Sequence, residues 1–178
     1  MSELNKTLED VFGYTSFRPG QEEVINHLMQ KKKLLAVMPT GAGKSLCYQL
    51  PALLFENQTI VVSPLVALMD DQVIGLKDLG VKAERVHSGM PESQRTQIWE
   101  DFKNKQIKIL YISPESLMRN EMLSALKPLG ISMFVVDEAH CISKWGSDFR
   151  REYELLKELQ NHFPETVISA FTATADEE

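Results

Sequence analysis

Strand-like and helix-like segments alternate along most of this chain. Apolar, largely β-branched runs predict strands, and residues with helical spacing between them predict helices. The alternation predicts right-handed βαβ crossovers and an α/β fold, in which a mainly parallel β-sheet is flanked by helices on both faces. The predicted strands are residues 34–38, 59–63, 107–113, 133–137 and 167–171, with a weaker candidate at 82–86, and the predicted helices are 21–30, 45–54, 65–79, 92–103, 116–126 and 151–162.

A glycine-containing loop joins the first predicted strand to the helix after it. This order is typical of a phosphate-binding loop, because backbone N–H groups and a helix N-terminus can surround the phosphates of a nucleotide. Lys44 would reach those phosphates as a point charge, and the hydroxyl of Ser45 would ligate Mg²⁺. The loop residues are Met38, Pro39, Thr40, Gly41, Ala42, Gly43, Lys44 and Ser45.

The loop departs from the strict phosphate-loop pattern at its first position, where Met38 replaces glycine. Gly41 and Gly43 remain, and they permit positive φ angles and a close approach of the backbone to an oxyanion. The departure therefore affects which branch of the phosphate-loop proteins the chain resembles more than whether it binds a nucleotide. The alternative is a strand-to-helix turn that contains glycine and lysine without binding a nucleotide.

Two carboxylates, Asp137 and Glu138, end the predicted strand 133–137. Asp137 is placed to hold Mg²⁺, usually through water, and Glu138 to orient the water that attacks a γ-phosphate. An ion-paired strand terminus is the alternative. Two hydroxyl residues, Thr172 and Thr174, follow the last predicted strand, where an ordinary helix cap would explain them equally well.

The phosphate loop, Asp-Glu-Ala-His at 137–140 and Thr-Ala-Thr at 172–174 resemble motifs I, II and III of superfamily 2 helicases. Further segments resemble the RecQ family of DNA helicases over essentially the whole chain. The resemblance implies a RecA-like P-loop domain that uses ATP and Mg²⁺ as cofactors. It also implies a set of catalytic residues, namely Lys44, Asp137, Glu138 and His140.

Residues 12–21 resemble the motif 0 of that family, which implies that Tyr14, Arg18 and Gln21 bind the adenine base. An amide suits this role, because it can both donate to and accept from the edge of adenine. A simpler explanation is that Gln21 lies near the start of an amphipathic helix and Arg18 is its solvated neighbour.

Three segments resemble the DNA contacts of the family. Two of them, Ser63, Pro64 and Leu65 in motif Ia and Ser113 and Pro114 in motif Ib, place hydroxyl groups at helix starts, which suits phosphate oxygens or simple helix capping. The third, residues 141–150, resembles the aromatic-rich loop of the RecQ family, whose rings could stack on unpaired bases or pack in a core. The residues implied to bind DNA there are Lys144, Trp145, Phe149 and Arg150. His140 would relay to Thr172 or Thr174.

The 178 residues fit a single domain, 1–178, and the formal net charge of −6 argues against a polyanion binder that relies on a broad positive field. Cys47 and Cys141 lack the spacing of a zinc site or a disulfide framework, so no zinc is expected here. Without a targeting segment or an apolar span, we expect an intracellular, soluble protein with no membrane partner, cytoplasmic and on the nucleoid if the source is bacterial.

These features predict the ATP-binding half of a RecQ-like DNA helicase. Its expected partners are DNA, as single strands and duplex junctions, and a second RecA-like domain of the parent chain that supplies arginines to the nucleotide. Because the chain ends just after the third motif, we expect weak nucleotide binding and little ATPase activity from this polypeptide alone. Two alternatives remain: an ATP-responsive nucleic-acid-binding module without unwinding activity, and an RNA-remodelling helicase.

Overall fold

A computed structural model describes residues 1–39, 42–119, 121–139 and 150–173, with the side chains of 150–153 excluded. Some of the predicted site residues lie outside this description. They are Thr40, Gly41, His140, Lys144, Trp145, Phe149 and Thr174, together with the side chain of Arg150.

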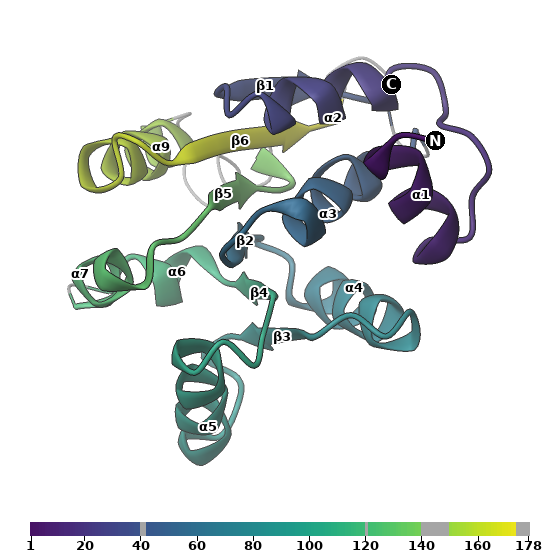
Figure 1. Ribbon diagram of the computed structural model, residues 1–178. Helices are drawn as coiled ribbons and strands as arrows, with labels where there is room; N and C mark the ends of the chain where they lie inside the picture. Colours follow the sequence, from purple (N-terminus) through teal and green to yellow (C-terminus); the bar gives the residue numbers. More distant parts are fainter. Residues whose placement is uncertain (40–41, 120, 140–149, 174–178) are drawn as a thin grey trace.

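The described strands form one sheet in which every pairing is parallel (Figure 1). Its strand order is β1-β6-β5-β2-β4-β3, so consecutive strands are joined by crossovers rather than hairpins. All the predicted strands are found, including the weak candidate at 82–86. The strands are β1 (Leu34–Val37), β2 (Thr59–Val62), β3 (Ala83–Val86), β4 (Ile109–Ile112), β5 (Met133–Val136) and β6 (Val167–Thr172).

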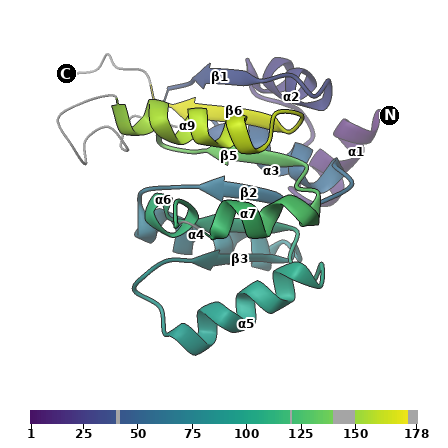
Figure 2. The same cartoon turned by 90° about the vertical axis from the view of Figure 1, so that its left-hand side faces the viewer.

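Helices cover both faces of the sheet, as the alternation predicted (Figure 2). One face packs against α1 (Glu3–Asp10), α2 (Gln21–Met29), α3 (Lys44–Leu54) and α4 (Val66–Asp78). The other packs against α5 (Glu92–Lys103), α6 (Pro114–Leu117), α7 (Met122–Leu126) and α9 (Arg150–His162), and a short 3₁₀ turn, η1 (Lys127–Leu129), follows α7.

Residues 116–126 form two short helices instead of the single helix that their spacing predicted, so that prediction was wrong. Ser113 caps α6, and Pro114 occupies its first turn, so this helix begins earlier than expected. Leu117 and Leu123 are both buried in the same core cluster. On one straight helix these two side chains would point about 120° apart, and the break lets both reach the sheet.

Helix α1 was not predicted from the sequence. The hydroxyl of Ser2 accepts a hydrogen bond from the backbone N–H of Asn5 at 3.2 Å, which caps the helix, and Leu8 is fully buried. A signal was available, because Leu4, Leu8, Val11 and Phe12 stand at helical spacing and pack in the same core cluster. The stability of this short helix comes from the cap and from packing of that apolar face against the rest of the domain.

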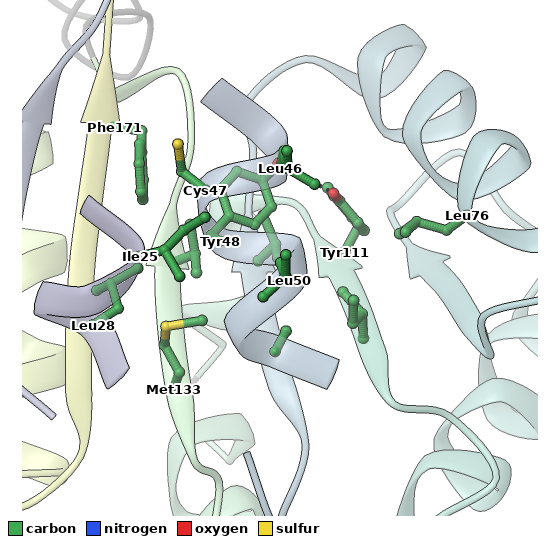
Figure 3. Close-up of a cluster of buried hydrophobic side chains, with 14 of the residues drawn as sticks. Ile25, Leu28, Leu46, Cys47, Tyr48, Leu50, Leu76, Tyr111, Met133 and Phe171 are labelled. Carbon is green, nitrogen blue, oxygen red and sulfur yellow. Dashed lines mark hydrogen bonds between the residues drawn. The ribbon is translucent and has the colours of Figure 1, made fainter. Parts of the chain in front are cut away.

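The core beside α3 is dominated by large apolar side chains (Figure 3). Ile25 and Leu28 of α2, Leu50 of α3, Met133 of β5 and Phe171 of β6 are completely buried there. Helix α3 packs beside α2 over one face of the sheet (Figure 1), and its first turn follows the loop that leaves the carboxyl end of β1. Ligands of open parallel sheets bind at this edge.

Candidate nucleotide-binding site

The phosphate loop leads from β1 into the first turn of α3. Gly43 has a φ of 75°, in the left-handed region that favours glycine, and it is the N-cap residue of α3. Gly43 has no side chain, so it cannot cap the first N–H groups of the helix as serine or aspartate would. The first N–H groups of α3 therefore face the cleft as donors, and the helix dipole favours an anion there.

The methionine that breaks the strict loop pattern is part of the core. Only 7% of Met38 is exposed, and its Sδ atom lies 3.9 Å from the Sγ atom of Cys47. Its backbone N–H donates to the carbonyl of Thr172 at 3.0 Å, which ties the start of the loop to the end of β6. Burial raises the pKa of the Cys47 thiol to about 12, so the thiol behaves as a neutral packing group.

Lys44 lies between the two predicted acidic residues. Its Nζ atom is 3.3 Å from Oδ1 of Asp137 and also forms a short ion pair with Oε1 of Glu138. Burial alone would lower the pKa of Lys44, but the two carboxylates outweigh burial and raise it, so Lys44 stays charged. Three of the predicted catalytic residues thus meet at one point, although two come from a strand end on the far side of β6 from β1.

Glu138 adopts an unusual backbone conformation at this point, with a φ of 52°. Its backbone N–H donates to Oδ1 of Asp137 at 2.8 Å, so the turn holds both carboxylates beside Lys44. A positive φ costs free energy in any residue other than glycine, and residues with this strain concentrate at functional sites.

These groups line a cleft of about 310 Å³ at the carboxyl edge of the sheet. Described residues of the predicted loop and both carboxylates contribute to its walls, so motifs that are distant in sequence line the same cleft. The predicted residues that line it are Arg18, Met38, Pro39, Gly43, Lys44, Ser45, Ser63, Asp137 and Glu138.

The donor set fits a magnesium nucleotide. Mg²⁺ usually takes one or two carboxylates, waters and substrate phosphates instead of an all-protein cage. In the described ranges, no three His, Cys, Asp or Glu side chains cluster closely enough to hold a metal ion by themselves. Asp137 and Ser45 line the same cleft and could supply the protein's share of such a coordination shell.

Gln21 is bonded to the phosphate loop in this structure. Only 3% of it is exposed, its Oε1 atom accepts from the backbone N–H of Arg18 at 2.8 Å, and its Nε2 atom donates to the carbonyl of Gly43 at 3.0 Å. A purely solvated helix start would not bury the amide in this way. Tyr14, by contrast, is 53% exposed and does not line the cleft. Adenine recognition by these residues stays a prediction.

The two serines of the predicted DNA contacts are buried. The hydroxyl of Ser63 is turned to the backbone N–H of Leu65 at 3.4 Å, and that of Ser113 caps α6 by accepting from the N–H of Ser116 at 3.4 Å. Pro64 is buried behind Ser63, and Pro114 begins α6. The capping alternative therefore holds for Ser113, whereas Ser63 does not cap α4, whose N-cap residue is Leu65. Contact of both segments with DNA stays a prediction.

Sequence reasoning missed two tyrosines behind the site. The hydroxyl of Tyr48 donates to Oδ2 of Asp137 at 2.7 Å and lies 3.1 Å from the hydroxyl of Tyr111. One signal was available: Tyr48 follows Lys44 by four residues, which puts both on the same face of a helix. Tyr111 gave no such signal, because an aromatic residue inside an apolar strand is ordinary core composition.

No helix in the described ranges is both long and apolar enough to cross a bilayer.

The family comparison agrees with this fold and site. Residues 18–178 match the family model described as DEAD/DEAH box helicase, and the chain belongs to this family. Curated relatives are named as DNA helicases. The chain is 48% identical over 169 residues to the ATP-dependent DNA helicase RecQ of Haemophilus influenzae, and the match covers 95% of this chain and 27% of the relative. It is 43% identical over 178 residues to the probable ATP-dependent DNA helicase RecS of Bacillus subtilis, covering 100% of this chain and 36% of the relative.

The resemblance to RecQ helicases is thereby confirmed. It spans about a quarter to a third of the length of these relatives, 27% and 36% respectively.

Solved structures share the fold. A hypothetical ATP-dependent RNA helicase from Sulfolobus tokodaii matches with a TM-score of 0.74 at 20% identity, covering 100% of this chain and 52% of that one. The DUF1998 helicase MrfA, in a complex with DNA and AMPPNP, matches with a TM-score of 0.75 at 19% identity, covering 98% of this chain and 26% of that one. These matches confirm the RecA-like helicase fold.

Proposed function

We propose that this chain is the ATP-binding motor domain of a RecQ-type DNA helicase, which couples ATP hydrolysis to movement along DNA and to strand separation. The observation that carries the proposal is the meeting of Lys44, Asp137 and Glu138 at the N-terminus of α3. A purely structural ion pair would not need a glycine N-cap with free helix N–H groups beside it.

Each residue has a distinct role in the proposal. The N–H groups of α3 and Lys44 bind the β- and γ-phosphates, and in doing so Lys44 exchanges its carboxylate partners for phosphate oxygens. Glu138 then accepts a proton from, and orients, the water that attacks the γ-phosphate. When bound, Mg²⁺ held by Ser45 and Asp137 would neutralise the charge that develops on the phosphates.

The proposal extends to partners of the longer protein. A second RecA-like domain supplies arginines to the open side of the cleft. DNA, as single strands and junctions, contacts the starts of α4 and α6 together with Lys144, Trp145, Phe149 and Arg150. Names of the curated relatives support DNA over RNA as the nucleic acid. The proposal implies an intracellular location, where ATP and DNA occur together.

The test is DNA-stimulated ATP hydrolysis by the longer protein that contains this domain. Glu138→Gln keeps the size and polarity of the side chain but removes its basicity, so turnover should fall by at least about 100-fold while nucleotide binding persists. Glu100→Gln, at an exposed position on α5, is the matched control and should retain turnover. Full activity in Glu138→Gln would refute the role assigned to Glu138. Stimulation of ATP hydrolysis by RNA but not by DNA would show that the nucleic-acid substrate is RNA.

A further inference from the structure

A chain of buried hydrogen bonds connects Asp137 to helix α4. Tyr48 donates to Asp137 at 2.7 Å, and the hydroxyls of Tyr48 and Tyr111 are 3.1 Å apart. The Nε2 atom of Gln49 then donates to the hydroxyl of Tyr111 at 3.0 Å and to Oε1 of Gln72 at 2.8 Å. The series begins at the acidic strand end and finishes on the helix that follows the Ser-Pro-Leu segment at 63–65.

The direction of these bonds follows from counting hydrogens. Tyr48 has one hydroxyl hydrogen and gives it to the ionised carboxylate of Asp137, so between the two phenols Tyr111 must be the donor. Tyr111 can then only accept from Gln49, whose amide uses both of its hydrogens, one toward Tyr111 and one toward Gln72. Both tyrosine hydroxyl hydrogens and both amide hydrogens of Gln49 therefore have a partner. From Gln49 the donors point through Tyr111 and Tyr48 toward Asp137, and the second amide hydrogen of Gln49 points the other way, to Gln72.

Burial makes this network sensitive to displacement. Tyr48 is fully buried, Tyr111 is 1% exposed and Gln49 is 7% exposed, so a broken bond would not be replaced by water. The ring of Tyr48 is also held by an edge contact with Phe171, with ring centroids 5.4 Å apart (Figure 3). The phenol oxygen of Tyr48 thus has little freedom to follow Asp137 if the carboxylate rotates.

The two oxygen atoms of the Asp137 carboxylate have different partners. Oδ2 of Asp137 accepts from Tyr48, whereas Oδ1 faces the N–H of Glu138 at 2.8 Å and Lys44 at 3.3 Å. Lys44 and Tyr48 stand one turn apart on α3 and therefore approach the two oxygens from the same helix. The orientation of Asp137 is fixed from both sides.

We propose that Tyr48 and Tyr111 are positioning residues for Asp137, and that through Gln49 and Gln72 they make its orientation depend on the position of α4. The proposal rests on the proposed function, because it assumes that Asp137 holds the magnesium of a bound nucleotide. A ligand that shifts α4 would thereby change the affinity for magnesium nucleotide, and the reverse change follows from linkage.

The test is a Mg²⁺ titration of the binding of a fluorescent ATP analogue to this chain. Tyr48→Phe removes one oxygen and should raise the Mg²⁺ concentration for half-maximal binding by about 10- to 100-fold, while Mg²⁺-free binding of the analogue stays the same. Thr59→Val is the matched control, because it removes a buried hydroxyl that has no hydrogen-bond partner among the described residues. It should leave the titration unchanged.

A double-mutant cycle separates transmission from local damage. Gln72→Ala should shift the Mg²⁺ midpoint in the wild-type background but not in Tyr111→Phe, where the chain is already cut between Tyr48 and Gln49. An equal shift in both backgrounds, or an unchanged midpoint in Tyr48→Phe, would overturn the proposal. If the wild-type chain bound no magnesium nucleotide at all, the proposed function itself would be refuted. Binding by the wild-type chain with an unchanged midpoint in Tyr48→Phe would refute only the positioning role.

Discussion

Gly43→Ala tests whether the phosphate loop and Gln21 form one packed unit. A Cβ atom at Gly43 would lie 2.1 Å from Nε2 of Gln21, a separation that side chains do not adopt. It would also occupy a residue with a φ of 75°, which costs an L-residue about 1–2 kcal/mol. The substitution therefore combines backbone strain with the displacement of a buried amide.

The expected magnitude follows from these two costs. The strain, reduced by about 0.4–1 kcal/mol because alanine restricts the unfolded chain, leaves a destabilisation of about 1 kcal/mol. Displacing Gln21 breaks its bond to the Gly43 carbonyl and leaves buried polar groups unpaired, which adds about 1–3 kcal/mol. We expect the free energy of unfolding to fall by about 2–4 kcal/mol.

The assay is urea denaturation followed by circular dichroism, with two glycine controls. Gly80 also has a positive φ, 82°, but nothing lies within 4 Å of an added Cβ, so Gly80→Ala should show the strain alone. Gly75 lies inside α4 without positive φ or a close neighbour, so Gly75→Ala should stabilise the protein by about 0.5–1 kcal/mol.

In a Gln21→Ala background the obstacle is gone, and Gly43→Ala should then cost only about as much as Gly80→Ala. The reasoning is refuted if Gly43→Ala and Gly80→Ala are equally destabilising in the wild-type background, or if Gln21→Ala leaves the cost of Gly43→Ala unchanged.

Two further predictions concern buried polar groups. Burial raises the pKa values of Tyr48 and Tyr111 above their ordinary value near 10, so above about pH 10 the unfolded chain binds fewer protons than the folded chain and the free energy of unfolding falls as pH rises. Denaturation at a series of alkaline pH values should show a slope smaller by about 1.4 kcal/mol per pH unit in Tyr111→Phe, and equal slopes would contradict the burial argument. Gln58 is 3% exposed and donates to the carbonyls of Phe102 and Ile107, so Gln58→Ala should lower the free energy of unfolding by about 2–3 kcal/mol. A change below about 0.5 kcal/mol, which is the scatter of surface substitutions, would show that water replaces the amide.

The sheet could be predicted from the sequence because its strands are short apolar runs in a strictly alternating order. Even the weak run at 82–86 forms β3, since β4 offers it a parallel partner. The strand order could not be predicted, because β1 pairs with β6, and β2 pairs with β4 and β5, although none of these strands is the next one along the chain. The break between α6 and α7 was equally hidden, because helical spacing does not reveal which faces must be buried.

The site was predictable where a side chain's chemistry is rare in a core. Asp137 and Glu138 at the end of a buried strand, and Lys44 at a helix start, are conspicuous for that reason. Tyr48 and Tyr111 are not, because only their hydroxyl groups take part and the rings are ordinary core components. Met38 looked like a defect in the loop, whereas its burial beside Cys47 shows that the first loop position belongs to the core.

Equilibrium binding of a fluorescent ATP analogue to this chain, with and without Mg²⁺, tests the central claim most directly. The claim is that Lys44, Asp137 and the N-terminus of α3 hold a magnesium nucleotide. We predict weak, Mg²⁺-dependent binding that Lys44→Ala abolishes, while Lys103→Ala, at an exposed position of α5, leaves it intact. Binding that is absent from the wild-type chain, or that survives Lys44→Ala unchanged, would contradict the account.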